Sequence, residues 1–298
     1  MEEHPDLDHA ATKRIIENIL KSVDLSDQAT RKIFKPFFVL FKDSFKTDDE
    51  ILKTWMSLYT ENSDDELDVI RKFWIKHIAQ GWGKIEKLEI IDIKPCFVND
   101  IKLILETVKD KVQVLTIKQI HYLEQNKFSK ILGDFLKNND ALAELTLHNV
   151  GLDLPVNMQN FANGLKHAKL KTLNIPHNNL RETCAKILAE GLRKNKSVET
   201  LDISNNSLGH EGLAHLADAL KKNNTLVSLD ISGNYLQTKG FEHLAAALII
   251  NKALKKIFIC DDWTFKPSDR KLLLQAIKER GVALEIFDMR NTKITIRP

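Results

Sequence analysis

The sequence predicts an α/β fold in which a short strand and a helix alternate along a solenoid. Alternating apolar residues such as Leu201 and Ile203 indicate a short strand with one buried side. A stretch with helical apolar spacing follows the strand, and the whole pattern returns every 28 residues. Because no single unit can bury its own apolar face, the units are expected to stack around one shared core.

The repeat is clearest where Val198, Leu201, Ile203, Asn206 and Leu208 give the pattern L-x-x-L-x-L-x-x-N-x-L. Further copies keep the 28-residue spacing; they open at Leu142, Leu170, Leu226 and Leu254 and hold Val150, Asn178, Asn234 and Asp262 in the asparagine slot. Weaker strand patterns occur near residues 85–90, 112–117 and 284–286. The pattern therefore predicts about 7–8 strand–helix units, with degenerate outer copies as expected for terminal repeats.

Each part of the unit has a physical reason. The asparagine stands where the chain turns out of the strand, and its amide can bond backbone groups that no ladder satisfies. The following run, Gly209 to Leu220, reads as an amphipathic helix, and Lys221 and Lys222 place positive charge at its C-terminal end.

Three regions are expected along the chain. Residues 1–82 lack the repeat and show four helical apolar patterns, residues 83–281 hold the repeats, and residues 282–298 form a C-terminal capping segment. Residues 1–82 are interpreted as an all-helical cap over the open end of the core. An F-box-like module over residues 15–55 is the alternative, although the usual Leu-Pro opening of that module is missing.

Composition excludes several classes of function. The 298 residues are 43% hydrophobic and 29% charged, with a net charge of +3. No long run of like charge occurs, so nucleic acid is not expected as a partner. The longest apolar runs are too short to span a bilayer, so no membrane partner is expected. Three cysteines without metal-ligand spacing indicate a reducing, cytoplasmic compartment, no metal and no cofactor.

A 28-residue unit with a full helix, and the phrase L-A-x-x-L-x-x-N, resembles the leucine-rich repeats of the ribonuclease-inhibitor type. The resemblance covers about residues 83–288 and implies a horseshoe arc that binds another protein. Such proteins can wrap an enzyme and block its active site. The chain is also similar to the leucine-rich-repeat effectors that intracellular bacteria secrete into the host cytosol. The resemblance thus implies a non-enzymatic inhibitor or effector, a monomer alone or in a 1:1 complex, with a ubiquitin-ligase substrate adaptor as the alternative.

The expected binding residues lie on the strand face and in the loops after the strands. Asp202, Asp230 and Asp261 suggest complementarity to a basic partner, or else a solvated strand face. Tyr235, Phe258, Trp263 and Phe287 are candidate aromatic anchors, and the last two could instead pack under the C-terminal cap. His148 and His177 complete the candidates.

A catalytic pair of His177 and Cys260 is not expected. These residues stand three repeats apart, which at the usual strand spacing places them roughly 14 Å from each other. The sequence therefore predicts no catalytic residue.

Overall fold

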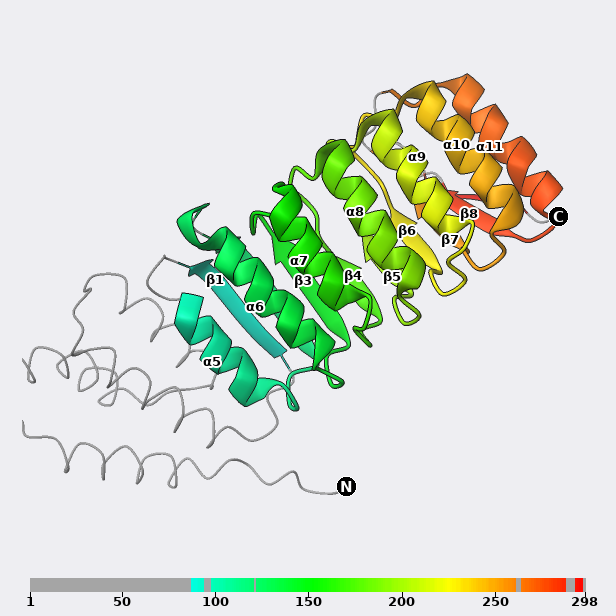
Figure 1. Ribbon diagram of the computed structural model, residues 1–298. Coiled ribbons are helices and arrows are strands. Elements are labelled where there is room, and N and C mark those ends of the chain that lie inside the picture. The colour runs from blue at the N-terminus through cyan, green and yellow to red at the C-terminus, as the bar shows by residue number, and fades with distance from the viewer. Residues whose placement is uncertain (1–86, 94–97, 121, 261–263, 288–292, 297–298) are drawn as a thin grey trace, which may run out of the picture. The chain divides into compact units, whose positions relative to one another are not determined.

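The computed structural model describes residues 87–93, 98–120, 122–260, 264–287 and 293–296. These residues belong to one compact unit that begins at Glu86. Strands and helices alternate along it (Figure 1). The strands are β1 (Lys87–Ile93), β2 (Val114–Ile120), β3 (Glu144–His148), β4 (Thr172–Asn174), β5 (Thr200–Asp202), β6 (Ser228–Asp230), β7 (Lys256–Phe258), β8 (Leu284–Phe287) and β9 (Lys293–Ile296). The helices are α5 (Val98–Val108), the 3₁₀ turn η2 (Tyr122–Glu124), α6 (Gln125–Lys137), α7 (Pro155–Leu165), α8 (Arg181–Lys194), α9 (Gly209–Leu220), α10 (Gln237–Ile250) and α11 (Pro267–Arg280).

One sheet holds all of these strands in chain order, and β1 to β8 are parallel. The predicted 28-residue step is the observed register, since Leu145, Leu173, Leu201 and Leu229 pair in succession. Only the step from β7 to β8 is longer by one residue, because Ile257 pairs with Ile286. The α/β solenoid predicted from the repeat is therefore confirmed.

The core lies between the sheet and a single layer of helices (Figure 1). Alternate strand residues are fully buried under the helices; they include Leu201, Ile203, Leu229 and Ile231. Neighbouring helices need about 8–10 Å between axes whereas neighbouring strands need only about 4.8 Å. The stack must therefore curve with the sheet on its inner side. We call the side of the sheet that faces away from the helices the sheet face.

A ladder of buried asparagines joins each repeat to the one before it. The Asn206 side-chain oxygen accepts the backbone N–H of Asn178 at 2.9 Å, and its Nδ2 donates to the carbonyl of Ile175 at 2.8 Å. Asn234 bonds the N–H of Asn206 in the same way, at 2.9 Å. Asn178 accepts the N–H of Val150 at 3.0 Å. The slot thus satisfies the backbone groups left where the strand ladder stops, which confirms the reason inferred from the sequence.

A second ladder closes the opposite ends of the helices. Asn195, Asn223 and Asn251 are buried, 28 residues apart, and each donates from Nδ2 to a carbonyl of the preceding repeat at 2.7 to 2.8 Å. Each side-chain oxygen also accepts an N–H three residues further on. By the β7–β8 register Arg280 takes this slot in the last unit, where its guanidinium donates to the Leu254 carbonyl.

The slot is imperfectly filled by Arg280. The side chain is 2% exposed, and its Nε and Nη1 have no hydrogen-bond partner within the described residues. Burial lowers the pKa of the guanidinium. The last unit therefore differs from the inner ones in chemistry as well as in spacing.

The two ends of the chain were predicted to differ from the repeats. Residues 1–82, and with them the helical cap and the F-box-like alternative, lie outside the described residues. In the predicted C-terminal segment, β9 pairs antiparallel with β8. This hairpin gives the last parallel strand a hydrogen-bonded neighbour.

The asparagine ladder gives a stability prediction. We expect Asn206→Ala to lower the free energy of unfolding by about 3–5 kcal/mol, since at least two buried backbone groups lose their partner at about 1–3 kcal/mol each. Denaturant unfolding of both proteins measures this. Asn163→Ala is the control, because Asn163 is exposed and bonds only Gln159 and Lys166 at the surface. Equal stabilities of the two variants would contradict the role of the ladder.

Candidate functional site

The sheet face carries side chains in rows across the strands. The intermediate-and-buried alternation of β3 to β6 shows that alternate residues point to this face. The register aligns two rows on the strands; the first is Val114, Glu144, Thr172, Thr200, Ser228, Lys256 and Glu285, and the second is Thr116, Thr146, Asn174, Asp202, Asp230, Phe258 and Phe287. Residues far apart in the chain therefore become neighbours at strand spacing.

The N-terminal half of the sheet face is held by polar contacts between neighbouring strands. Lys118 forms an ion pair with Glu89 at 2.7 Å. Asn174 donates from Nδ2 to the Thr146 hydroxyl at 3.1 Å and to Glu144 at 3.4 Å. These side chains already have partners, so they offer less to a ligand than the strands that follow.

The two predicted carboxylates are adjacent in the second row. Asp202 pairs with Asp230 in the register, and both are partly exposed. Each also has a local task, because Asp202 accepts the N–H of Ser204 at 2.8 Å and Asp230 that of Ser232 at 2.9 Å. The aspartates thus hold the strand end and present negative charge on the sheet face at the same time. The two sequence interpretations of this pair are compatible.

Next to these carboxylates the row continues into an aromatic residue. Phe258 pairs with Asp230 and is half-buried on the sheet face. Phe287 follows it in the register, although its side chain lies outside the described residues, as do Asp261 and Trp263. Of the predicted aromatic group, Phe258 and Tyr235 can therefore be placed.

Tyr235 stands in a backbone conformation that does not favour an aromatic residue. Its φ is +55°, and the equivalent positions hold Asn179 and Ser207 with φ of +51° and +55°. The left-handed region suits glycine and asparagine, and costs other residues about 1–2 kcal/mol. The Tyr235 side chain is nevertheless 45% exposed. Folding stability does not account for a tyrosine here, which favours a role at the surface.

His148 and His177 form a second, separate group two strands away from Asp202. Their ring centroids are 5.1 Å apart at 41°, and His177 Nε2 lies 3.4 Å from the Asn205 amide. Partial burial lowers the pKa of His148, and the nearby His177 and Lys118 charges lower it further. The sheet face is therefore divided into a histidine pair over β3–β4 and an acidic–aromatic group over β5–β7.

The described cysteines have different surroundings. Cys184 is buried and its thiol donates to the Asp153 carbonyl at 3.2 Å, and burial raises its pKa to about 11. Cys260 is half-buried at the end of the sheet-face row after β7. Cys96 lies outside the described residues. Among the residues that the structure describes, no three His, Cys, Asp or Glu side chains gather in a group that could hold a metal ion.

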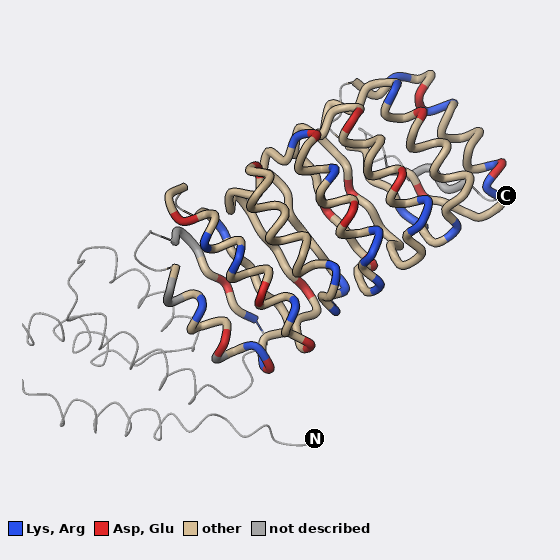
Figure 2. Tube along the Cα trace, in the orientation of Figure 1, with Lys and Arg blue, Asp and Glu red and all other residues tan. Residues whose placement is uncertain are grey.

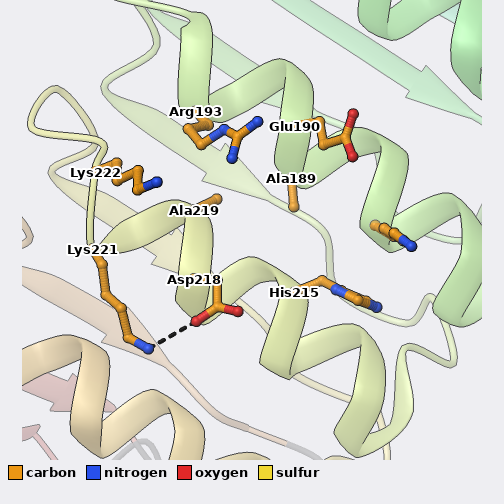
Figure 3. Close-up of a pocket in the computed structure, with 9 residues that line it drawn as sticks. Ala189, Glu190, Arg193, His215, Asp218, Ala219, Lys221 and Lys222 are labelled. Carbon is orange, nitrogen blue, oxygen red and sulfur yellow. Dashed lines mark hydrogen bonds and ion pairs between the residues drawn. The ribbon is translucent and has the colours of Figure 1, made fainter.

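On the helix side, a shallow groove of about 340 Å³ lies between α8 and α9 (Figure 3). Its lining is Lys186, Ala189, Glu190, Arg193, His215, Asp218, Ala219, Lys221 and Lys222. Lys221 bonds Asp218 at 2.7 Å and lowers the pKa of that carboxyl. The sequence interpretation missed this groove; the signal for it was the recurrence of basic pairs 28 residues apart, at Arg193–Lys194 and Lys221–Lys222.

Comparison with known proteins supports the fold. No family model matches the chain, and no curated protein matches it. Among solved structures, the leucine-rich repeat-containing protein LegL7 from Legionella pneumophila aligns with a TM-score of 0.52 at 19% identity, covering 75% of this chain and 72% of that chain.

Two shorter structures also align, each with a TM-score of 0.43. The leiomodin-1 actin-binding site 2 is 19% identical over 54% of this chain and 90% of its own. The tropomodulin C-terminal domain of Caenorhabditis elegans is 16% identical over 51% of this chain and 92% of its own.

Tyr235 gives the first prediction for this site. We expect Tyr235→Asn to raise the free energy of unfolding by about 1 kcal/mol, because the left-handed backbone no longer carries an aromatic residue. Thermal and denaturant unfolding measure the change. Asn179→Tyr, at the equivalent position of an earlier repeat, should destabilise by a similar amount. A loss of stability in Tyr235→Asn would show that packing of the ring, not surface function, keeps the tyrosine.

The histidine pair gives the second. The pKa of His148 should lie below 6.5 in the folded protein, and His177→Gln should raise it part of the way back. NMR titration of the imidazole signals measures both. Because the folded-state pKa is the lower one, this contribution to stability is fully present above pH 6.5 and is lost as pH falls through the folded-state pKa. A His148 pKa at or above 6.5 would contradict the assignment.

The parallel strands in 28-residue register, the helix layer, the asparagine ladder and the likeness to LegL7 together identify this chain as a leucine-rich-repeat protein.

Proposed function

We propose that the chain is a binding module that holds another protein against the sheet face, over β5 to β7 and the loops that follow them. The observation that carries this proposal is Tyr235, an exposed aromatic residue kept at a left-handed position where neighbouring repeats have Asn179 and Ser207. Aromatic residues are the usual energetic anchors of protein interfaces. A tyrosine that stability does not explain is best explained by binding.

The charge and shape of this region suggest the chemistry of the partner. Asp202 and Asp230 lie next to Phe258 in one row. A partner that presents basic side chains around an apolar contact is complementary to such a row. Opposite charges of this kind mainly raise the association rate and the specificity.

Rigidity supports the same role. The asparagine ladder and the strand register fix the backbone under these side chains before any partner arrives. A preorganised surface loses little conformational entropy on binding, so a larger share of the contact energy appears as affinity. We propose further that the chain acts as an inhibitor, by covering the working surface of a partner enzyme in a 1:1 complex.

The test begins with capture of the partner on the full chain and continues with calorimetry on the purified pair. We expect Phe258→Ala to weaken binding about 10- to 100-fold, the effect of losing a buried aromatic anchor, and Tyr235→Asn to weaken it while the fold stays intact. Ile250→Ala is the matched control, because it removes an exposed apolar side chain, 56% accessible, from the helix side.

Unchanged affinity in both sheet-face variants would place the site elsewhere, and an equal loss in Ile250→Ala would point to the helices. If the partner is an enzyme, its activity should fall to a plateau at one equivalent of the chain. Undiminished activity in the saturated complex would remove the inhibitor role and leave the binding role.

A further inference from the structure

The described residues carry a strongly basic edge where the helices end and the chain returns to the next strand. Figure 2 shows lysines and arginines following one another along this edge. We define the basic edge as residues 109–113, 137–143, 166–171, 193–199, 221–227, 252–256 and 278–283. These segments occupy equivalent places in successive repeats, at the C-terminal ends of α5 to α11.

Charge is segregated to this edge. Its segments contain sixteen lysines and arginines but only four aspartates and glutamates. The remaining residues between 87 and 298 hold fifteen lysines and arginines against twenty aspartates and glutamates. The near-neutral total of +3 therefore conceals a basic strip. No run of like charge was visible along the chain because the cations are brought together from positions about 28 residues apart.

Complementing the helix dipoles does not account for the strip. A cation at a helix C-terminus is favourable only within about the last turn. Lys171 lies six residues beyond α7, and Lys255 lies five beyond α10. Nor are the charges neutralised locally. Ion pairs join Lys169 to Asp140 and Lys171 to Glu199.

Other lysines of the edge lack such a carboxylate. Lys194, Lys196, Lys222 and Lys255 are exposed and form no ion pair with any residue that the structure describes. Free positive charge repeated along one edge indicates a partner with many negative charges.

The side-chain types point to one kind of polyanion. The basic edge contains no Phe, Tyr or Trp, so it has no platform on which unpaired bases could stack. Among its exposed cations, Arg193 is the single arginine; the others are lysines. Lysine acts as a point charge and lacks the fork that reads phosphates and base edges in two bonds. The edge is suited to a smooth field of negative charge.

Geometry favours a flat partner. Equivalent segments of stacked repeats form a band that runs from the helix ends to the strand starts. A plane can meet all the segments of such a band at once, whereas a duplex is convex and touches it along a line. The groove between α8 and α9, lined by Arg193 and Lys222, lies at this edge and can receive one phosphate headgroup (Figure 3).

We infer that the basic edge docks the protein on a membrane surface of anionic phospholipids. Binding is electrostatic and peripheral, since the described part of the chain has no helix long and apolar enough to cross a bilayer. The docked edge leaves the sheet face directed sideways and accessible to a protein partner. This inference does not depend on what the sheet face binds, and it replaces the expectation of no membrane partner that the net charge suggested.

The test is co-sedimentation of the full chain with vesicles of phosphatidylcholine alone or with about 30 mol % phosphatidylserine. We expect binding only to the anionic vesicles, weakening as salt rises from about 0.1 M to 0.5 M. The variant Lys194→Glu, Lys196→Glu, Lys222→Glu should reduce partitioning at least about a hundredfold. Its matched control is Lys127→Glu, Lys130→Glu, Lys239→Glu, which changes three exposed lysines away from the edge and alters net charge equally.

Retained binding by the control and lost binding by the edge variant, with both melting as the wild type does, support the inference. Absence of binding to anionic vesicles overturns it, and so does equal loss in both variants, which would reflect net charge alone. Duplex RNA and DNA are added as competitors. If either binds through the same three lysines more tightly per phosphate than the vesicles do, the partner is a nucleic acid and the membrane assignment is wrong.

Discussion

The fold depends on the buried asparagine that follows each inner strand. Where β4, β5 and β6 stop after three residues, the sheet no longer pairs the backbone, yet the chain is still inside the protein. Asn178, Asn206 and Asn234 supply the missing partners, each to its own turn and to the repeat before it. Because each side chain reaches one repeat back, a repeat cannot form these bonds alone. The ladder therefore links local turn geometry to the stacking of the whole unit.

This constraint also explains where function can reside. The asparagines and the strand leucines are fixed by the core, whereas the alternate strand positions and the two loop edges are free to vary in chemistry. The sheet face gathers Asp202, Asp230 and Phe258, and the edge where the helices end gathers lysines. Both surfaces are assembled from residues about 28 positions apart, so neither resembles a linear motif. A partner protein on the sheet face and an anionic surface on the edge can be bound together, because the two lie on different sides of the solenoid.

Sequence reasoning predicted what the repeat period determines. The strand positions, the inward leucines and the asparagine slot follow from periodicity, and so does the adjacency of Asp202 and Asp230. It did not foresee that these carboxylates also cap Ser204 and Ser232, because a side chain's local bond is set by backbone geometry. The basic edge and the groove at α8–α9 were missed for a different reason: charge was considered along the chain, whereas the fold sums it across repeats. Trp263 and Asp261 stay predictions, since they lie outside the described residues.

The central claim is that the sheet face over β5 to β7 holds a partner protein. Hydrogen–deuterium exchange of the chain, free and saturated with the captured partner, tests it most directly. The account predicts slower exchange in peptides that contain the turns after β5, β6 and β7, around Ser204, Tyr235 and Cys260, and no change in the exposed halves of α8 to α10. Slowing confined to the helices, with unchanged exchange around Tyr235 and Cys260, would contradict it.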